Sequence, residues 1–178
     1  MKYLRLLFVI LLSVVCLAFA LQASQDKADT KESEEDGVHW YGYQEGWEKA
    51  VEENKHLFVN FTAVWCKWCK ELDKRVFNQS PVYEQLNNDF VPVKVWQKDT
   101  TMLNISGYQI STQDLIRSEF RVSSYPQLWF VSPEGLRIGP WKGFLPDTLL
   151  IKFLDDVQHY RYDSTRGENG EKIKPSGD

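Results

Sequence analysis

The feature that most constrains the fold is a near-continuous apolar run at residues 56–62, His-Leu-Phe-Val-Asn-Phe-Thr. Such a run is typical of a strand buried on both faces, whereas a half-buried strand alternates apolar and polar residues. A helical pattern follows at residues 66–77 and opens with Cys66 and Cys69. A doubly buried strand followed by a helix indicates an α/β domain built in layers.

The rest of the chain continues this alternation of helices and strands. Further strands are predicted at residues 90–96, 127–132 and 136–141, and the turn Pro133-Glu134-Gly135 joins the last two as a hairpin. Helical spacing predicts helices at 45–54, 81–88, 112–120 and 146–158. The order predicts an α/β fold with a central mixed β-sheet flanked by helices on both faces.

The first 23 residues are interpreted as a signal peptide. Lys2 and Arg5 precede an apolar run at residues 6–21, and small residues suited to cleavage follow. The run is short for a membrane span of about 20 residues, so we expect cleavage and a periplasmic protein, with a membrane anchor as the alternative. Lipidation of Cys16 is a third reading, which bulky Val15 disfavours.

Two polar segments flank the predicted domain at residues 38–160. Residues 24–37 form an acidic linker and residues 161–178 a polar tail, and both compositions favour disorder. The formal net charge is -4, which gives no reason to expect nucleic-acid binding. We expect a monomer.

Without the signal peptide, Cys66 and Cys69 are the only cysteines left. A bridge between them closes almost no loop and would stabilise little, so a reactive role is favoured. Cys66 lies at a helix N-terminus, where unpaired N–H groups stabilise a thiolate, and Cys69 follows one turn later on the same face. The alternatives are two inert thiols or half of a zinc site, but zinc wants four ligands and no second cysteine pair exists. We therefore expect no metal and no cofactor beyond the redox-active disulfide.

The arrangement of these motifs resembles thioredoxin. A buried strand precedes Trp65-Cys66-Lys67-Trp68-Cys69-Lys70, and Tyr125-Pro126 precedes the hairpin. Residues 56–95 also resemble exported relatives, such as the C-terminal domain of the bacterial thiol–disulfide interchange reductase. The resemblance implies that Pro126 is cis beside the cysteines and that the Tyr125 backbone pairs with a substrate strand. Trp65 and Trp68, beside the thiol, would form an apolar lip for an extended peptide, with packing as the alternative.

The chain departs from the thioredoxin pattern at several positions. Asn60 replaces the strand carboxylate, Lys67-Trp68 replaces Gly-Pro between the cysteines, and residues 97–110 form a longer segment. Lys94 has two readings, as the counterpart of thioredoxin's buried lysine or as a solvated edge residue. Asn60, Lys67 and Lys94 are thus candidates for tuning the redox chemistry.

Together these features predict an exported thiol–disulfide oxidoreductase that acts on protein disulfides and serves cell redox homeostasis. The resemblance favours a reductase that receives electrons from a membrane donor. An oxidase or isomerase is the alternative within the same chemistry. A binding module is the alternative from another class, namely a redox-inert thioredoxin fold that holds a client or delivers copper.

Overall fold

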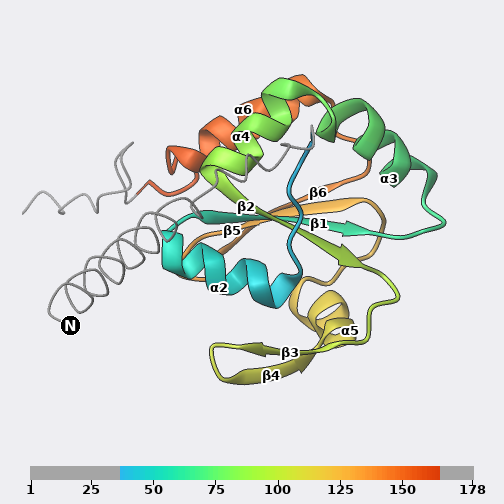
Figure 1. Ribbon diagram of the computed structural model, residues 1–178, viewed down its shortest axis with the longest axis vertical. Coiled ribbons are helices and arrows are strands. Elements are labelled where there is room, and N and C mark those ends of the chain that lie inside the picture. Colours follow the sequence, from blue (N-terminus) through green and yellow to red (C-terminus); the bar gives the residue numbers. More distant parts are fainter. Residues whose placement is uncertain (1–36, 165–178) are drawn as a thin grey trace, which may run out of the picture. The chain divides into compact units, whose positions relative to one another are not determined.

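The computed structural model describes residues 37–164, which contain a four-stranded mixed sheet (Figure 1). The strand order is β2-β1-β5-β6, with β1 (His56–Thr62) parallel to β2 (Phe90–Trp96) and antiparallel to β5 (Gln127–Val131). β6 (Arg137–Lys142) pairs antiparallel with β5. The ends of β1, β2 and β6 and the start of β5 therefore meet at one edge of the sheet.

Helices cover both faces of this sheet, which confirms the predicted fold class. The cover of one face consists of α3 (Lys67–Leu72), the π-helical turn η1 (Asp73–Phe77), α4 (Ser80–Asp89) and α6 (Asp147–Gln158). The cover of the other face consists of α2 (Tyr43–Glu53), α5 (Thr112–Asp114) and the π-helical turn η2 (Leu115–Glu119).

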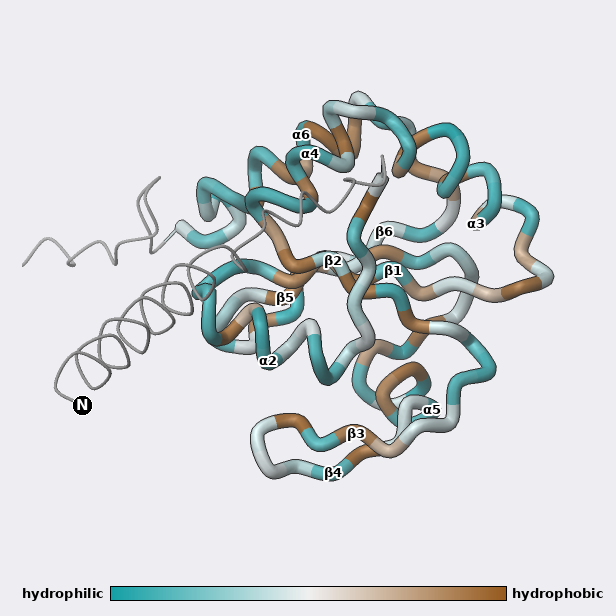
Figure 2. Tube along the Cα trace, in the orientation of Figure 1, coloured by the Kyte–Doolittle hydropathy of each residue, from teal (hydrophilic) through white to brown (hydrophobic). Residues whose placement is uncertain are grey.

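The apolar run of β1 supplies both cores, because successive side chains of a strand point to opposite faces. Val59 and Phe61 pack in the core under α2 and η2, while Phe58 packs under η1, α4 and α6. Every residue of β1 is buried. Figure 2 shows the matching pattern in the helices, where hydrophobic and hydrophilic residues alternate along α4 and α6. The reading of residues 56–62 as a doubly buried strand is therefore confirmed.

Most predicted elements lie at or near their expected bounds. The strands at 56–62 and 90–96 have the predicted limits, and the expected helices at 66–77 and 112–120 each continue from an α-helix into a π-helical turn. The Ser111 hydroxyl accepts a hydrogen bond from the Asp114 N–H at 3.1 Å, so Ser111 is the N-cap of α5.

One pair of strands was not predicted. β3 (Met102–Ile105) and β4 (Tyr108–Ser111) form a separate hairpin in the segment that is longer than in thioredoxin. Its two-residue turn, Ser106-Gly107, has positive φ at both positions, which is the geometry that suits a tight hairpin. The sequence carried this signal, since Leu103, Ile105 and the Ser-Gly pair follow the hairpin pattern.

The predicted signal peptide at 1–23, residues 24–36 of the linker and residues 165–178 of the tail lie outside the described residues. Ordered contacts continue past the expected boundary at residue 160, because Tyr162 packs against the core and its hydroxyl lies 2.6 Å from His56 Nε2. Between residues 37 and 164, no helix has the length and apolar character needed to cross a membrane.

Candidate active site

Cys66 and Cys69 form a disulfide at the edge of the sheet where β1 ends. The chain leaves β1 through residues 63–65, and the Cys66 N–H donates to the Ala63 carbonyl at 3.0 Å, which closes a tight turn. Cys66 is the N-cap of α3, and the two Cα atoms are 5.3 Å apart. The strand and the helix thus place the pair together, as the sequence predicted.

The two sulfur atoms differ in their hydrogen bonding. The backbone N–H of Cys69 donates to Cys66 Sγ at 3.0 Å, an interaction that also caps α3. A thiolate at Cys66 would gain from this donor and from the positive end of the helix dipole. Exposure does not separate the cysteines, because they are 4% and 3% exposed. The asymmetry expected in their reactivity therefore comes from the N–H donor and the helix N-terminus, not from exposure.

The Tyr125–Pro126 peptide bond is cis, as the resemblance implied. Pro126 is buried at the start of β5, and its carbonyl accepts the Gly143 N–H at 2.9 Å, which ties this loop to the end of β6. Tyr125 packs against Ala63 and the two cysteines. Burial raises the pKa of the Tyr125 hydroxyl, although the nearby Arg117 guanidinium partly opposes this shift. The loop therefore lies directly beside the disulfide.

Aromatic side chains form a rim around the disulfide. Trp65 and Trp68 are 63% and 55% exposed, which is unusual for side chains of this size. The Trp65 ring meets the Tyr125 ring edge-on at 5.8 Å between centroids, and Trp68 lies 5.9 Å from Phe144. Sequence reasoning did not select Phe144, because a single aromatic residue in a loop carries no pattern. An exposed aromatic rim of this kind suits contact with another chain.

Asn60 lies on β1 and faces α3 and η1, with Lys94 and Leu128 beside it in register. It is 1% exposed, and its Oδ1 atom has no hydrogen-bond partner within the described residues. An unpaired buried amide oxygen is uncommon, since most buried polar atoms find a partner. The strand position therefore holds a neutral, desolvated side chain.

Lys94 is largely buried, so its reading as a solvated edge residue is wrong. Its ammonium group donates to Asp73 Oδ1 at 2.8 Å and lies 4.6 Å from the centre of the Trp40 ring. Sequence reasoning missed Asp73. The available signal was its spacing, because Asp73 follows Cys69 by four residues and so shares a helix face with it. A carboxylate thus stands near the site on η1 and not on the strand.

Lys67 and Lys70 are exposed on α3 beside the disulfide, and neither makes an ion pair with any residue between 37 and 164. In the same part of the chain, no cluster of three or more histidine, cysteine or acidic side chains has the arrangement of a metal site. A cavity of about 370 Å³ lies between β6 and α6, but neither cysteine lines it.

Residues 43–158 match a family model described as a thioredoxin-like domain. Among curated proteins, human Spermatogenesis-associated protein 20 is 37% identical over 59 residues, or 33% of this chain. The matched region spans only 8% of that much longer protein. A Caenorhabditis elegans protein, B0495.5, matches over the same length at 34% identity.

Solved structures share the fold. A thioredoxin from Thermus thermophilus is 25% identical with a TM-score of 0.56, covering 68% of this chain and 87% of that one. A putative disulphide-isomerase from Bacteroides thetaiotaomicron is 28% identical with a TM-score of 0.53, covering 68% and 93%. The C-terminal domain of DsbD from Neisseria meningitidis, in its reduced form, is 19% identical with a TM-score of 0.50, covering 63% and 90%.

Proposed function

The chain belongs to the thioredoxin-like domain family, and on that premise we propose that it exchanges disulfides with other proteins through Cys66 and Cys69. One observation carries the proposal: the two cysteines are joined at the start of α3, and Cys66 Sγ accepts the Cys69 N–H. A structural bridge over such a short loop would contribute little to stability. A sulfur beside an N–H donor, within an exposed aromatic rim, suits reversible exchange.

The proposed reaction begins with the reduced pair. The Cys66 thiolate attacks one sulfur of a substrate disulfide, forms a mixed disulfide and releases the other substrate sulfur as a thiolate, which takes a proton. Cys69 then loses its proton and attacks Cys66 Sγ. The mixed disulfide breaks, the intramolecular disulfide forms, and the substrate leaves as a dithiol. Two electrons pass from the cysteine pair to the substrate, and a thiol donor must reduce Cys66–Cys69 before the next cycle.

The proposed direction is reduction, with a membrane protein as the electron donor. The resemblance of residues 56–95 to the exported interchange reductase supports this choice. The relative from Bacteroides thetaiotaomicron is described as a putative disulphide-isomerase, so isomerisation and oxidation are the competing directions. The reduction potential separates them, because this fold spans about −270 to −120 mV and reductases lie at the negative end.

An insulin-reduction assay with dithiothreitol tests the activity, and equilibration with glutathione buffers gives the potential. We expect catalysed reduction by the wild type and none by Cys66→Ser. The Cys69→Ser variant should accumulate mixed disulfides with substrate that disappear on adding reductant. If the wild type reduces no disulfide and neither variant captures substrate, the binding-module alternative replaces this proposal.

The proposed location is the periplasm, after cleavage of the signal peptide before Leu21 or Ser24. The sequence pattern of residues 1–23 supports this location. N-terminal sequencing of protein recovered from the periplasm should begin at one of these two residues. Full-length protein retained in the membrane fraction would instead indicate an uncleaved anchor.

A further inference from the structure

The basic side chains of the described residues divide into two sets. One set forms ion pairs with carboxylates: Lys49, Lys55, Arg75, Lys94, Arg137, Lys152 and Arg161. The other set makes no ion pair within residues 37–164: Lys67, Lys70, Lys74, Lys98, Arg117, Arg121 and Lys142. The unpaired residues come from several distant segments of the sequence, so only the fold shows whether they lie together.

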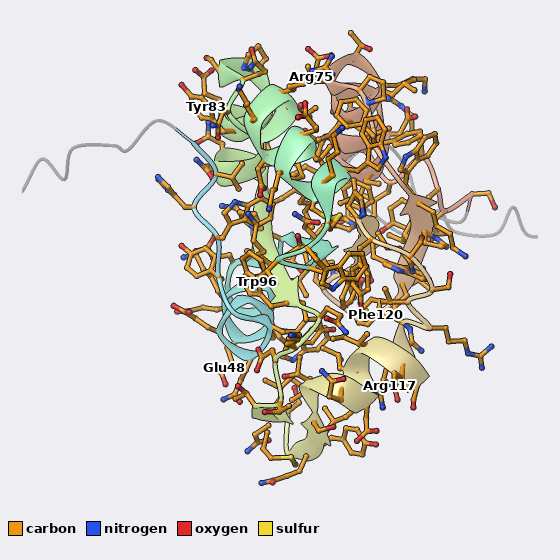
Figure 3. All side chains as sticks on the ribbon, turned by 90° about the vertical axis from the view of Figure 1, so that its right-hand side faces the viewer. Glu48, Arg75, Tyr83, Trp96, Arg117 and Phe120 are labelled. Carbon is orange, nitrogen blue, oxygen red and sulfur yellow. A yellow bond between two sulfur atoms is a disulfide. The ribbon has the colours of Figure 1, made fainter. Side chains whose placement is uncertain are left out.

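Five of the seven unpaired basic residues lie at or near the edge of the sheet that carries the disulfide. Lys67 and Lys70 lie on α3, which begins there, and Lys98 follows the end of β2 by two residues. Lys142 ends β6 opposite Gln127, and its ammonium group donates to Ser123 Oγ at 2.9 Å. Arg117 is close enough to Tyr125 to act on the pKa of its hydroxyl. Figure 3 looks onto this edge, with Trp96 and Arg117 labelled.

Paired basic residues lie elsewhere or are already neutralised. Lys55 and Arg137 stand at the starts of β1 and β6, at the opposite edge of the sheet. Among the carboxylates on this side, Asp73 is paired with the Lys94 ammonium. Three others accept only from neutral donors and keep their negative charge: Asp99, Asp114 and Asp147. Glu71 lies 4.0 Å from Arg75. Five unpaired cations, Lys67, Lys70, Lys98, Arg117 and Lys142, therefore face three unpaired carboxylates, so the site edge carries an excess of positive charge on a chain whose formal net charge is -4.

The same edge exposes large apolar side chains. Val64, Trp65 and Trp68 are exposed around the disulfide, and Trp96 is exposed at the end of β2. Apolar contact supplies affinity for a partner chain. Unpaired positive charges favour a partner of negative charge and increase its association rate. A partner that complements this edge combines negative charge with apolar side chains.

We propose that the substrate segment docked across Cys66 is acidic and carries an apolar side chain next to its reactive cysteine. This inference rests on the proposed function and specifies its substrate class. The unpaired cations attract the acidic residues, and the aromatic rim of Trp65 and Trp68 receives the apolar side chain. Because exposed charges are screened over about 8 Å at physiological salt, the preference should weaken as ionic strength rises.

Two disulfide-bonded peptides test the proposal. They share one sequence with an aromatic residue beside the cysteine, and differ only in flanks of aspartate and glutamate or of lysine. We expect kcat/KM for the acidic peptide to exceed that for the basic peptide by about tenfold or more at low salt, and the ratio to fall at high salt. Equal values at both salt concentrations would overturn the inference while leaving the proposed function intact.

Charge-removing variants locate the effect. The triple variant Lys98→Gln, Arg117→Gln and Lys142→Gln should lose most of the acidic preference while still reducing the basic peptide. A matched triple variant away from this edge, Lys49→Gln, Lys152→Gln and Arg161→Gln, should keep the wild-type ratio. If both triple variants change the ratio alike, the preference is not set by the site edge and the inference fails. If neither peptide nor insulin is reduced by the wild type, the proposed function fails and the inference with it.

Discussion

Replacing Asn60 with aspartate places a carboxyl group where the structure offers no hydrogen-bond donor. Asn60 is 1% exposed and its Oδ1 atom is unpartnered, while the neighbouring Lys94 ammonium is already bound to Asp73. Burial raises carboxyl pKa values by up to about 3–5 units, and the partial attraction of Lys94 reduces this, so we expect a folded-state pKa of about 6.5. The unfolded value is about 3.9.

The sign of the effect follows from proton binding. Between these two pKa values the folded variant holds a proton that the unfolded chain has lost, so the free energy of unfolding falls as pH rises. At about 1.36 kcal/mol per pKa unit, the variant should be less stable than the wild type by about 1 kcal/mol at pH 4.5 and by about 3.5 kcal/mol at pH 8.

Urea denaturation of both proteins across this pH range measures the difference. Asn88→Asp, at an exposed position of α4, is the control and should change stability by less than about 0.5 kcal/mol with little pH dependence. If Asn60→Asp gives a pH profile parallel to that of the wild type, position 60 is not desolvated in solution and the reasoning is refuted. Single-turnover kinetics of the same variant would show whether a carboxyl group here changes the pH dependence of mixed-disulfide resolution by Cys69.

Three further outcomes follow from particular contacts. Gly46→Ala should lower the free energy of unfolding by about 1–3 kcal/mol in urea denaturation despite its better helix propensity, because a Cβ there would lie 2.2 Å from Val93 Cγ2; an unchanged midpoint would show that α2 shifts freely. Asp73→Asn should cost about 1–3 kcal/mol in the same assay, because it leaves the largely buried Lys94 ammonium without its carboxylate; a neutral result would mean that water satisfies the lysine. After reduction, iodoacetamide should modify Cys66 before the second cysteine, as judged by peptide mass spectrometry, because Cys66 Sγ has the N–H donor; equal labelling would contradict the assigned roles.

Local patterns in the sequence were sufficient for the main elements and for the reactive pair. The limits of β1 and β2 follow from runs of apolar residues, and the helices follow from their spacing. The Cys66–Cys69 disulfide joins residues three apart, so their proximity needs only a helix turn. The hairpin of β3 and β4 was also encoded locally, in its alternation and Ser-Gly turn, and was overlooked.

Only the tertiary structure decided which side chains surround the disulfide, and which of them are buried or ion-paired. Lys94 is buried because β2 lies parallel to β1 in a register that sets it beside Asn60, with Asp73 above it on η1. Lys142 and Phe144 reach the site because antiparallel pairing returns the end of β6 to the edge where β1 ends, and Arg117 approaches Tyr125 from η2. Sequence patterns report contacts between neighbours along the chain, whereas burial, ion pairing and the gathering of unpaired charge depend on contacts between distant segments.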